Sequence, residues 1–321
     1  MAYQDVGTPR FYVNILEYLG AIGYTEINNR YRTNPASMES GGQTITTSIP
    51  LNIFPEESFV AYLGHTGGDL SQNEGGAVTE IINGFSDVSP NAINPDRAGF
   101  SIVSFNGLNL ANEITTYNAN KIGSIVVGNY YDMPHSPDLS LTMTREYGGI
   151  KTIETKGGAS LSNAFYTKPP KWGDASAWEI YTVTPTNHAL SRSGRRIWDL
   201  SFSYLSSRDS FGANSLMSQA MYTTDGYVEG EGDGDEDWYY NTDGHGNVFS
   251  NKLAAEPSFY AQVIHKTNGG QLPFIFQPDG GTNGNNNPDQ FAICKFDMKS
   301  FEFEQVANGV YNMKLKIREV W

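Results

Sequence analysis

The sequence is poor in charged residues and has a single cysteine. Charged residues make up 17% of the 321 residues, below the roughly 25% of ordinary globular domains. The single cysteine, Cys294, excludes an intrachain disulfide and a cysteine-based metal cluster. Because Cys294 stands in the strand-like run Ala292–Phe296, we expect it to be a core residue rather than a reactive thiol.

Basic residues and long apolar runs are also scarce. The chain has 21 Lys and Arg against 35 Asp and Glu, a net charge of −14, which argues against binding nucleic acid through its phosphates. No window approaches the roughly 18 apolar residues of a membrane span. The opening residues, MAYQDVGTPR, lack the apolar core of a secretory signal, so we expect synthesis in the cytoplasm.

Glycine and aromatic residues replace the missing charge. The chain contains 34 Gly, 19 Tyr and 17 Phe, together with many Asn, Ser and Thr residues. Turn formers and strand formers are therefore abundant, whereas helix formers are few. The composition predicts an all-β protein: a mainly antiparallel β-sandwich or barrel with long loops and one or two short helices.

The two parts of the chain differ in the density of strand patterns. Residues 1–98 are rich in loops, with one clear strand at 58–63 and a stretch at 9–22 that fits either a strand or a helix. Residues 99–321 form the expected β-sandwich core, interrupted by an acidic insertion at about 223–250. Further strands are predicted at 99–105, 122–131, 139–147, 150–155, 178–183, 196–205, 259–266 and 272–276. Residues 210–222 give the most convincing short helix, with Asp209 or Ser210 as its cap.

The last residues alternate with a period of two, which predicts a strand with one buried face. Its apolar positions are Tyr311, Met313, Leu315 and Ile317, and its basic positions are Lys314, Lys316 and Arg318. In the earlier strand we expect Trp198, Leu200, Phe202 and Tyr204 to share one face. Phe274 and Phe276 complete the expected core. The three basic side chains form a basic face in an acidic protein, so we expect them at an interface with the acidic insertion of a neighbouring copy.

The acidic insertion contains the one metal-binding pattern in the sequence. Asp233, Asp235 and Asp237 stand at alternate positions, as in the first half of a calcium loop. The pattern then departs from such a loop, with Trp238 where glycine is needed and Gly244 where glutamate is needed. These three aspartates are a candidate calcium site, and the alternative is a solvated loop tip that deters unwanted edge pairing.

No motif for catalysis or cofactor binding is found, so we expect neither enzymatic activity nor a bound cofactor. The five histidines lack metal-binding spacing, and no nucleophile elbow or phosphate loop occurs. Aromatic residues in polar loops are typical of sugar-binding proteins. The candidates for stacking on a sugar are Trp172, Trp178, Trp238, Tyr239 and Tyr240. The alternative is that they are core or interface anchors, the more common role of buried Trp and Tyr in a β-sandwich.

Four segments resemble the tail proteins of tailed bacteriophages. They are Arg195-Arg-Ile-Trp-Asp-Leu-Ser-Phe-Ser-Tyr-Leu205, Pro273-Phe-Ile-Phe-Gln-Pro-Asp279, Phe291-Ala-Ile-Cys-Lys-Phe296 and Leu315-Lys-Ile-Arg-Glu-Val-Trp321. Their order is similar to that of distal tail and baseplate-hub proteins, and the resemblance extends over residues 123–321. It implies a β-sandwich subunit that forms a ring, usually a hexamer, between the tail tube and the receptor-binding parts.

The sequence therefore leads to one main hypothesis and two alternatives. The main hypothesis is a structural virion protein, made in the host cytoplasm, whose partners are its own copies and other tail or baseplate proteins. Many aromatic residues, low charge and long polar loops suit protein–protein surfaces. The alternatives are a carbohydrate-binding β-sandwich, either a receptor binder or a glycan hydrolase, and a capsid decoration or head–tail connector subunit.

Overall fold

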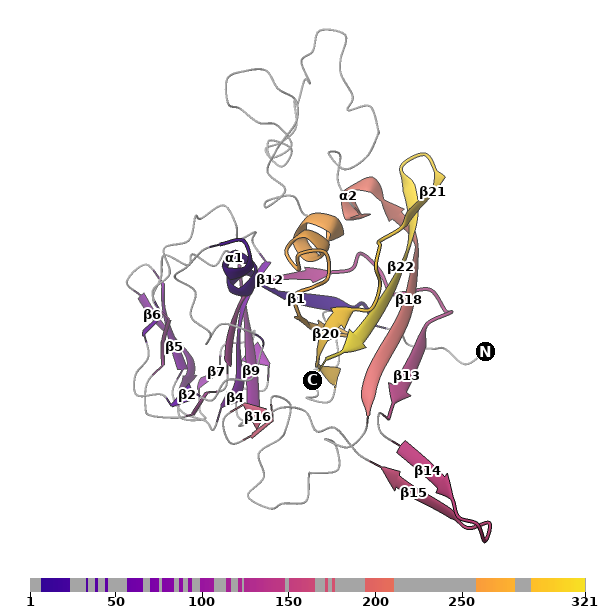
Figure 1. Ribbon diagram of the computed structural model, residues 1–321. Coiled ribbons are helices and arrows are strands. Elements are labelled where there is room, and N and C mark those ends of the chain that lie inside the picture. The colour runs from indigo at the N-terminus through magenta and orange to yellow at the C-terminus, as the bar shows by residue number, and fades with distance from the viewer. Residues whose placement is uncertain are drawn as a thin grey trace.

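The fold is a curled antiparallel sheet that forms a half-barrel (Figure 1). The computed structural model describes residues 7–23, 33, 38–39, 44–45, 57–65, 70–74, 77–83, 87–88, 92–93, 99–106, 114–116, 121–122, 124–147, 150–164, 171–172, 175–176, 194–210, 258–280 and 290–320. Strands predominate among these residues and the helices are short. The all-β prediction is confirmed.

The main sheet has eleven strands, and all of its pairings are antiparallel. In spatial order its path is β13 (Thr142–Glu146), β18 (Arg195–Ser206), β22 (Val310–Glu319), β20 (Ala292–Phe296), β19 (Phe274–Gln277), β1 (Arg10–Asn14), β12 (Ser124–Asp132), β4 (Glu57–His65), β9 (Gly99–Asn106) and β8 (Ala92–Ile93). The eleventh strand, β21 (Phe303–Ala307), pairs with β22. Strands from the first 98 residues therefore lie in the same sheet as the C-terminal strands.

Smaller sheets accompany the half-barrel. One has five strands in the order β3 (Thr44–Ile45), β10 (Ile114–Thr116), β5 (Leu70–Glu74), β6 (Ala77–Asn83) and β7 (Asp87–Val88). The two-stranded sheets are β11 (Lys121–Ile122) with β2 (Met38–Glu39), β16 (Lys171–Trp172) with β17 (Ala175–Ser176), and β14 (Ile150–Glu154) with β15 (Ser160–Ala164). The β14–β15 hairpin projects away from the body beyond β13 (Figure 1).

The central strands bury both of their faces. On β1, Phe11 and Val13 belong to one apolar cluster, whereas Tyr12 between them belongs to another. On β19, Phe274 and Phe276 join the first cluster and Ile275 joins the second. Continuous apolar runs in these strands therefore reflect two cores, one on each side of the sheet.

Residues 9–22, whose pattern fits either a strand or a helix, contain both: a strand followed directly by a helix. β1 ends at Asn14, and α1 (Ile15–Ala21) begins at the next residue. The Asn14 side chain accepts a hydrogen bond from the backbone N–H of Glu17 at 3.1 Å. This cap satisfies one of the N–H groups that the first turn of a helix leaves unpaired.

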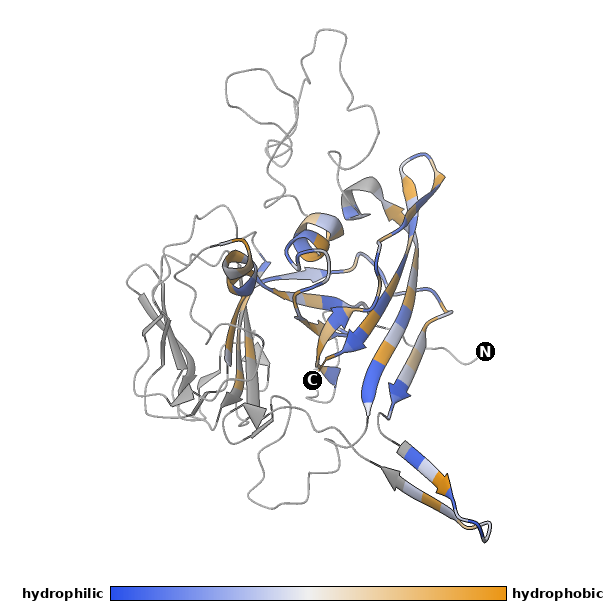
Figure 2. Ribbon diagram, viewed as in Figure 1, coloured by the Kyte–Doolittle hydropathy of each residue, from blue (hydrophilic) through white to orange (hydrophobic). Residues whose placement is uncertain are grey.

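The predicted alternation on β22 is confirmed, and on β18 it holds up to Phe202. Tyr311, Met313, Leu315 and Ile317 are buried, and Figure 2 shows the alternation as bands along both strands. Tyr204 was expected on the inner face with Phe202, and that expectation is wrong. A β-bulge places Ser203 and Tyr204 opposite the single residue Asn312, so Tyr204 is 82% exposed and Leu205 is buried instead.

The strand predicted at 259–266 is also wrong, because this segment is the helix η5 (Tyr260–His265), a π-helix. Its β-branched and aromatic residues favour a strand by propensity. In the structure, however, Phe259 and Val263 lie four residues apart and pack into the same cluster. The Ser258 hydroxyl, just before the helix, accepts a hydrogen bond from the backbone N–H of Ala261 at 3.2 Å. Burial on several sides outweighs the strand propensity here.

Two predicted elements fall outside the described residues. These are the strand at 178–183 and residues 211–222 of the predicted helix; the described α2 (Ser207–Ser210) ends where that helix was expected to begin. Within the part of the chain that the structure describes, no helix has the length and apolar character needed to cross a membrane.

Candidate functional site

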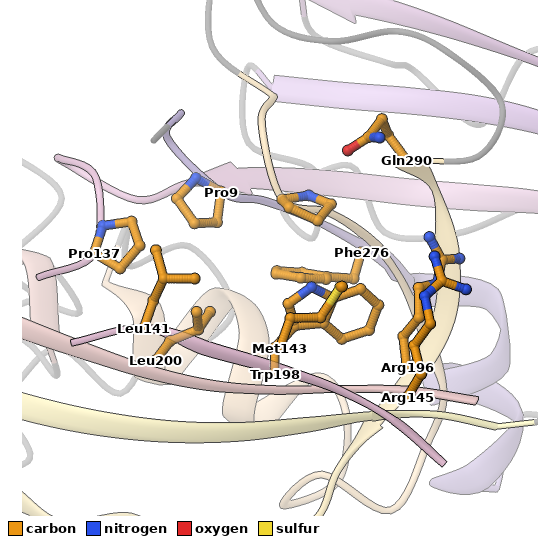
Figure 3. Close-up of a pocket in the computed structure, with 11 residues that line it drawn as sticks. Pro9, Pro137, Leu141, Met143, Arg145, Arg196, Trp198, Leu200, Phe276 and Gln290 are labelled. Atoms are coloured by element: carbon orange, nitrogen blue, oxygen red, sulfur yellow. The ribbon is translucent and has the colours of Figure 1, made fainter. Parts of the chain in front are cut away.

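A pocket of about 360 Å³ opens beside β13, at one edge of the main sheet. Its side chains come from both walls of the half-barrel (Figure 3). The first wall consists of Pro137, Leu141, Met143, Arg145, Arg196, Trp198 and Leu200, from β13, β18 and the segment before β13. The second consists of Pro9, Phe276, Pro278 and Gln290, from β19 and from residues that flank β1, β19 and β20. We call this site the β13 pocket.

The floor of the β13 pocket is part of the main core. Trp198 and Leu200 occupy inward positions of β18, and both are at most 5% exposed. The ring of Trp198 meets the ring of Phe276 edge to face, with their centroids 5.2 Å apart. Met143 at the rim is 48% exposed. The pocket is thus a place where the apolar core reaches the surface.

Two arginines give one end of the β13 pocket a positive character. Arg145 on β13 lies directly opposite Arg196 on β18, and Figure 3 shows their side chains next to each other. Arg196 is held by Glu319, with Nη2 3.0 Å from Oε1 and Nε 3.1 Å from Oε2, and its Nη2 donates to the carbonyl of Phe291 at 2.6 Å. Its guanidinium also lies 5.2 Å from the Trp198 ring centroid. Arg145 is exposed at the surface.

The described lining of the β13 pocket combines apolar side chains with guanidinium groups. Among the lining residues that the structure describes, none carries a carboxylate, imidazole, thiol or hydroxyl group. The apolar floor suits a bulky side chain, and the guanidinium of Arg145 at the surface suits an adjoining carboxylate. A ligand that combines both features fits this arrangement.

The β14–β15 hairpin is the second feature of functional interest. Every residue from Lys151 to Ser162 is exposed, and Ile153 and Leu161 lie opposite each other with exposed fractions of 53% and 61%. A tight turn closes the hairpin, with the Gly158 N–H donating to the carbonyl of Thr155 at 2.9 Å. An isolated hairpin is only marginally stable in water. This apolar pair is therefore suited to contact with another chain.

A buried polar cluster lies where η5 meets β12. Lys266 is 1% exposed, and its Nζ donates to Gln262 Oε1 at 2.5 Å and to Asn129 Oδ1 at 3.3 Å. Asn129 Nδ2 donates to the same Gln262 oxygen at 2.8 Å. Burial lowers the pKa of Lys266 to about 7. None of Lys266, Gln262 and Asn129 lines the β13 pocket.

The structure places the three residues of the predicted basic interface on the outer side of β22. Lys314 and Lys316 are exposed, and Lys316 Nζ lies 3.7 Å from Asp297 Oδ2. Arg318 pairs with Glu146 of β13. Two of the three cations thus have carboxylate partners within their own chain. Their role at an interface stays a prediction.

The other predicted sites can be placed only in part. Asp233, Asp235 and Asp237, the candidate calcium ligands, lie outside the described residues, as do Trp178 and Trp238–Tyr240. Within the described ranges, no group of three or more His, Cys, Asp or Glu side chains is placed to hold a metal ion. Cys294 is a core residue as predicted, and burial raises the pKa of its thiol well above the usual value.

Sequence reasoning found neither the β13 pocket nor the buried lysine. The pocket joins residues as far apart as Pro9 and Pro278, and no local pattern marks such a site. The available signal was the position of Leu141, Met143 and Arg145 at every second residue, just before and along β13. For Lys266 the signal was its position four residues after Gln262, which brings the two side chains together only in a helix.

Comparisons with known proteins give no relative. No protein-family model, no curated protein and no solved structure matches the chain.

Proposed function

We propose that the chain is a structural, non-enzymatic virion protein of a tailed phage: a tail or baseplate-hub subunit that forms a ring with its own copies. The observation that carries this proposal is the β14–β15 hairpin, which is exposed from Lys151 to Ser162, with the apolar pair Ile153 and Leu161 on one face. A projecting element with an apolar face suits docking on a neighbouring subunit. When such a contact joins two different surfaces, repetition generates a ring or a filament.

The open edge of the main sheet also supports assembly. β13 pairs with β18 on one side, and no described strand pairs with its other side. An unpaired edge presents main-chain donors and acceptors to another chain. The hairpin and the open edge are different surfaces of the same chain, so each can contact a neighbouring copy.

The arrangement of the strands supports the phage-tail part of the proposal. The four segments that resemble tail proteins cover all or part of β18, β19, β20 and β22. These strands are consecutive neighbours in the sheet, in the order β18, β22, β20, β19. The resemblance therefore falls on one contiguous part of the fold rather than on scattered segments.

Light scattering coupled to size-exclusion chromatography, followed by electron microscopy, tests the proposal. A hexameric ring of 35.3-kDa chains has a mass of about 212 kDa. The double variant Ile153→Asp, Leu161→Asp is expected to remain folded by circular dichroism and to lose the ring. A wild-type chain that stays monomeric up to its solubility limit would contradict the proposal.

The matched control changes the opposite face of the same hairpin. Thr152 and Ser162 also form a cross-strand pair, and both are exposed. The variant Thr152→Asp, Ser162→Asp places the same two charges opposite each other, so it destabilises the hairpin to a similar extent. It is expected to keep the ring. Equal loss of assembly in both variants would show that the apolar face has no special role.

A further inference from the structure

Three residues just before and along β13 form the side of the β13 pocket that lies nearest the open edge of the sheet. Leu141, Met143 and Arg145 line it at every second position. A strand added to this edge would place every second side chain on the same face, beside these three residues. An extended peptide that matches the order therefore needs a carboxylate beside Arg145 and apolar side chains beside Met143 and Leu141.

The direction of the added strand fixes the order of the peptide. All pairings in the main sheet are antiparallel, so an added strand in keeping with the sheet runs opposite to β13. Read along its own chain, the peptide then meets Arg145 first, Met143 second and Leu141 third. Its pattern is an acidic residue, followed two and four residues later by large apolar or aromatic residues.

The chain itself contains this pattern in its acidic insertion. Glu236, Trp238 and Tyr240 stand two residues apart in the run Asp235-Glu-Asp-Trp-Tyr-Tyr240. In the antiparallel register, Glu236 meets Arg145, Trp238 meets Met143 and Tyr240 meets Leu141. Asp235 would face outward beside Glu146, whose carboxylate is paired with Arg318.

We propose that the β13 pocket binds the segment Asp235–Tyr240 of a second copy as an added antiparallel strand, with Glu236 against Arg145 and the Trp238 side chain over the apolar floor. The second copy as the source rests on the proposed function. The acidic segment thus meets the arginine end of the pocket. The basic face of β22 is less suited to it, because its side chains lie on the outer side of the strand and do not line the pocket with its apolar floor.

A binding assay with a synthetic peptide tests the match between segment and pocket. The probe is a fluorescein-labelled peptide of residues 233–241, titrated with full-length chain and followed by anisotropy. In that chain, Glu236→Arg, Trp238→Ser and Tyr240→Ser remove competition from its own segment. We expect saturable binding, weakened about tenfold or more by Arg145→Glu, since reversal of the charge replaces an attraction by a repulsion.

Two controls separate this register from general charge attraction. Lys314→Glu makes the same change in charge on the basic face of β22, and it is expected to leave peptide binding within about twofold of the unmodified host chain. A peptide with Glu236→Arg is expected to restore binding to the Arg145→Glu chain. Absence of saturable binding, equal effects of Arg145→Glu and Lys314→Glu, or no restoration by the exchanged charge would each overturn the inference.

Disulfide trapping tests the second copy as the source. A Met143→Cys chain is mixed with a Trp238→Cys chain and oxidised; Cys294 is fully buried and stays in place. We expect a covalent dimer that neither variant gives alone. A cross-link confined to a single chain carrying both substitutions would overturn the inference.

The two proposals fail in distinguishable ways. A ring that forms while the peptide shows no saturable binding overturns this inference and leaves the proposed function standing. Peptide binding that depends on Arg145, in a chain that stays monomeric, contradicts the ring and with it the second copy as the source.

Discussion

Replacing the buried lysine by methionine is expected to stabilise the protein, and to do so more at low pH than at high pH. The change is Lys266→Met, which keeps an unbranched chain of similar size. Burial lowers the pKa of Lys266 from 10.5 to about 7. This difference corresponds to a penalty of roughly 5 kcal/mol for holding the charged amine in the folded state.

The sign of the pH dependence follows from proton binding. Between pH 7 and 10.5 the folded state holds a neutral amine and the unfolded state a charged one. The unfolded state therefore binds more protons, and the stability of the wild type rises with pH across this window. The penalty for burying Lys266 is therefore complete below pH 7 and absent above pH 10.5. The neutral amine keeps two N–H donors, which match the acceptors on Gln262 and Asn129.

The methionine variant lacks both the penalty and the two hydrogen bonds. The lost bonds offset roughly 2 kcal/mol, which leaves a net gain of roughly 3 kcal/mol below pH 7. This gain is expected to shrink by about 1.4 kcal/mol per pH unit from pH 7 upward. Urea unfolding followed by tryptophan fluorescence at pH 6, 7, 8 and 9 measures it.

The difference between the two proteins is the quantity to compare, because titration of groups that do not interact with Lys266 cancels. His265 is the exception, since burial and the charge of Lys266 both lower its pKa. An exposed lysine, Lys314→Met, provides the control. A free-energy difference between Lys266→Met and wild type that stays constant from pH 6 to pH 9 would refute the argument. A variant less stable than wild type at pH 6 would show that the hydrogen bonds outweigh the buried charge.

Three further outcomes are expected. Glu319→Gln breaks the buried pair with Arg196 and is expected to cost about 3 to 5 kcal/mol of unfolding free energy, measured by urea titration; a loss under about 1 kcal/mol would contradict this. Gly128→Ala puts a methyl group onto the carbonyl oxygen of Val13, so we expect a poorly folded chain by near-UV circular dichroism, and a native spectrum would refute the clash. If Asp233, Asp235 and Asp237 bind calcium, a chelator lowers the melting temperature measured by scanning fluorimetry; an unchanged melting temperature removes the site.

The strands could be predicted wherever one face is buried and the other is exposed. On β22 the buried residues alternate with Lys314 and Lys316, and the period of two identifies the strand unambiguously. The helix η5 could not be predicted in this way. Its residues from Ala261 to Ile264 are all buried, so no polar face reveals the helical period.

Features that depend on distant contacts could not be predicted from the sequence. The bulge at Tyr204 follows from the register of β18 against β22, and an isolated strand pattern gives no indication of an extra residue. The floor of the β13 pocket depends on Phe276 lying across the half-barrel from Trp198. Neither residue differs in type from an ordinary core residue, so the opening to the surface is visible only in the fold.

The bulge in β18 has a consequence for the pairing of the C-terminal strand. The backbone N–H of Tyr204 donates to the side chain of Asn312 at 3.3 Å, which ties the extra residue to one position on β22. Sliding β22 along β18 by two residues preserves the inward and outward sides of a regular pair. Here the same movement carries Asn312 away from the extra residue and separates Leu205 from Tyr311. The bulge therefore fixes the register of β22 against β18, and a slipped pairing of the two strands is disfavoured.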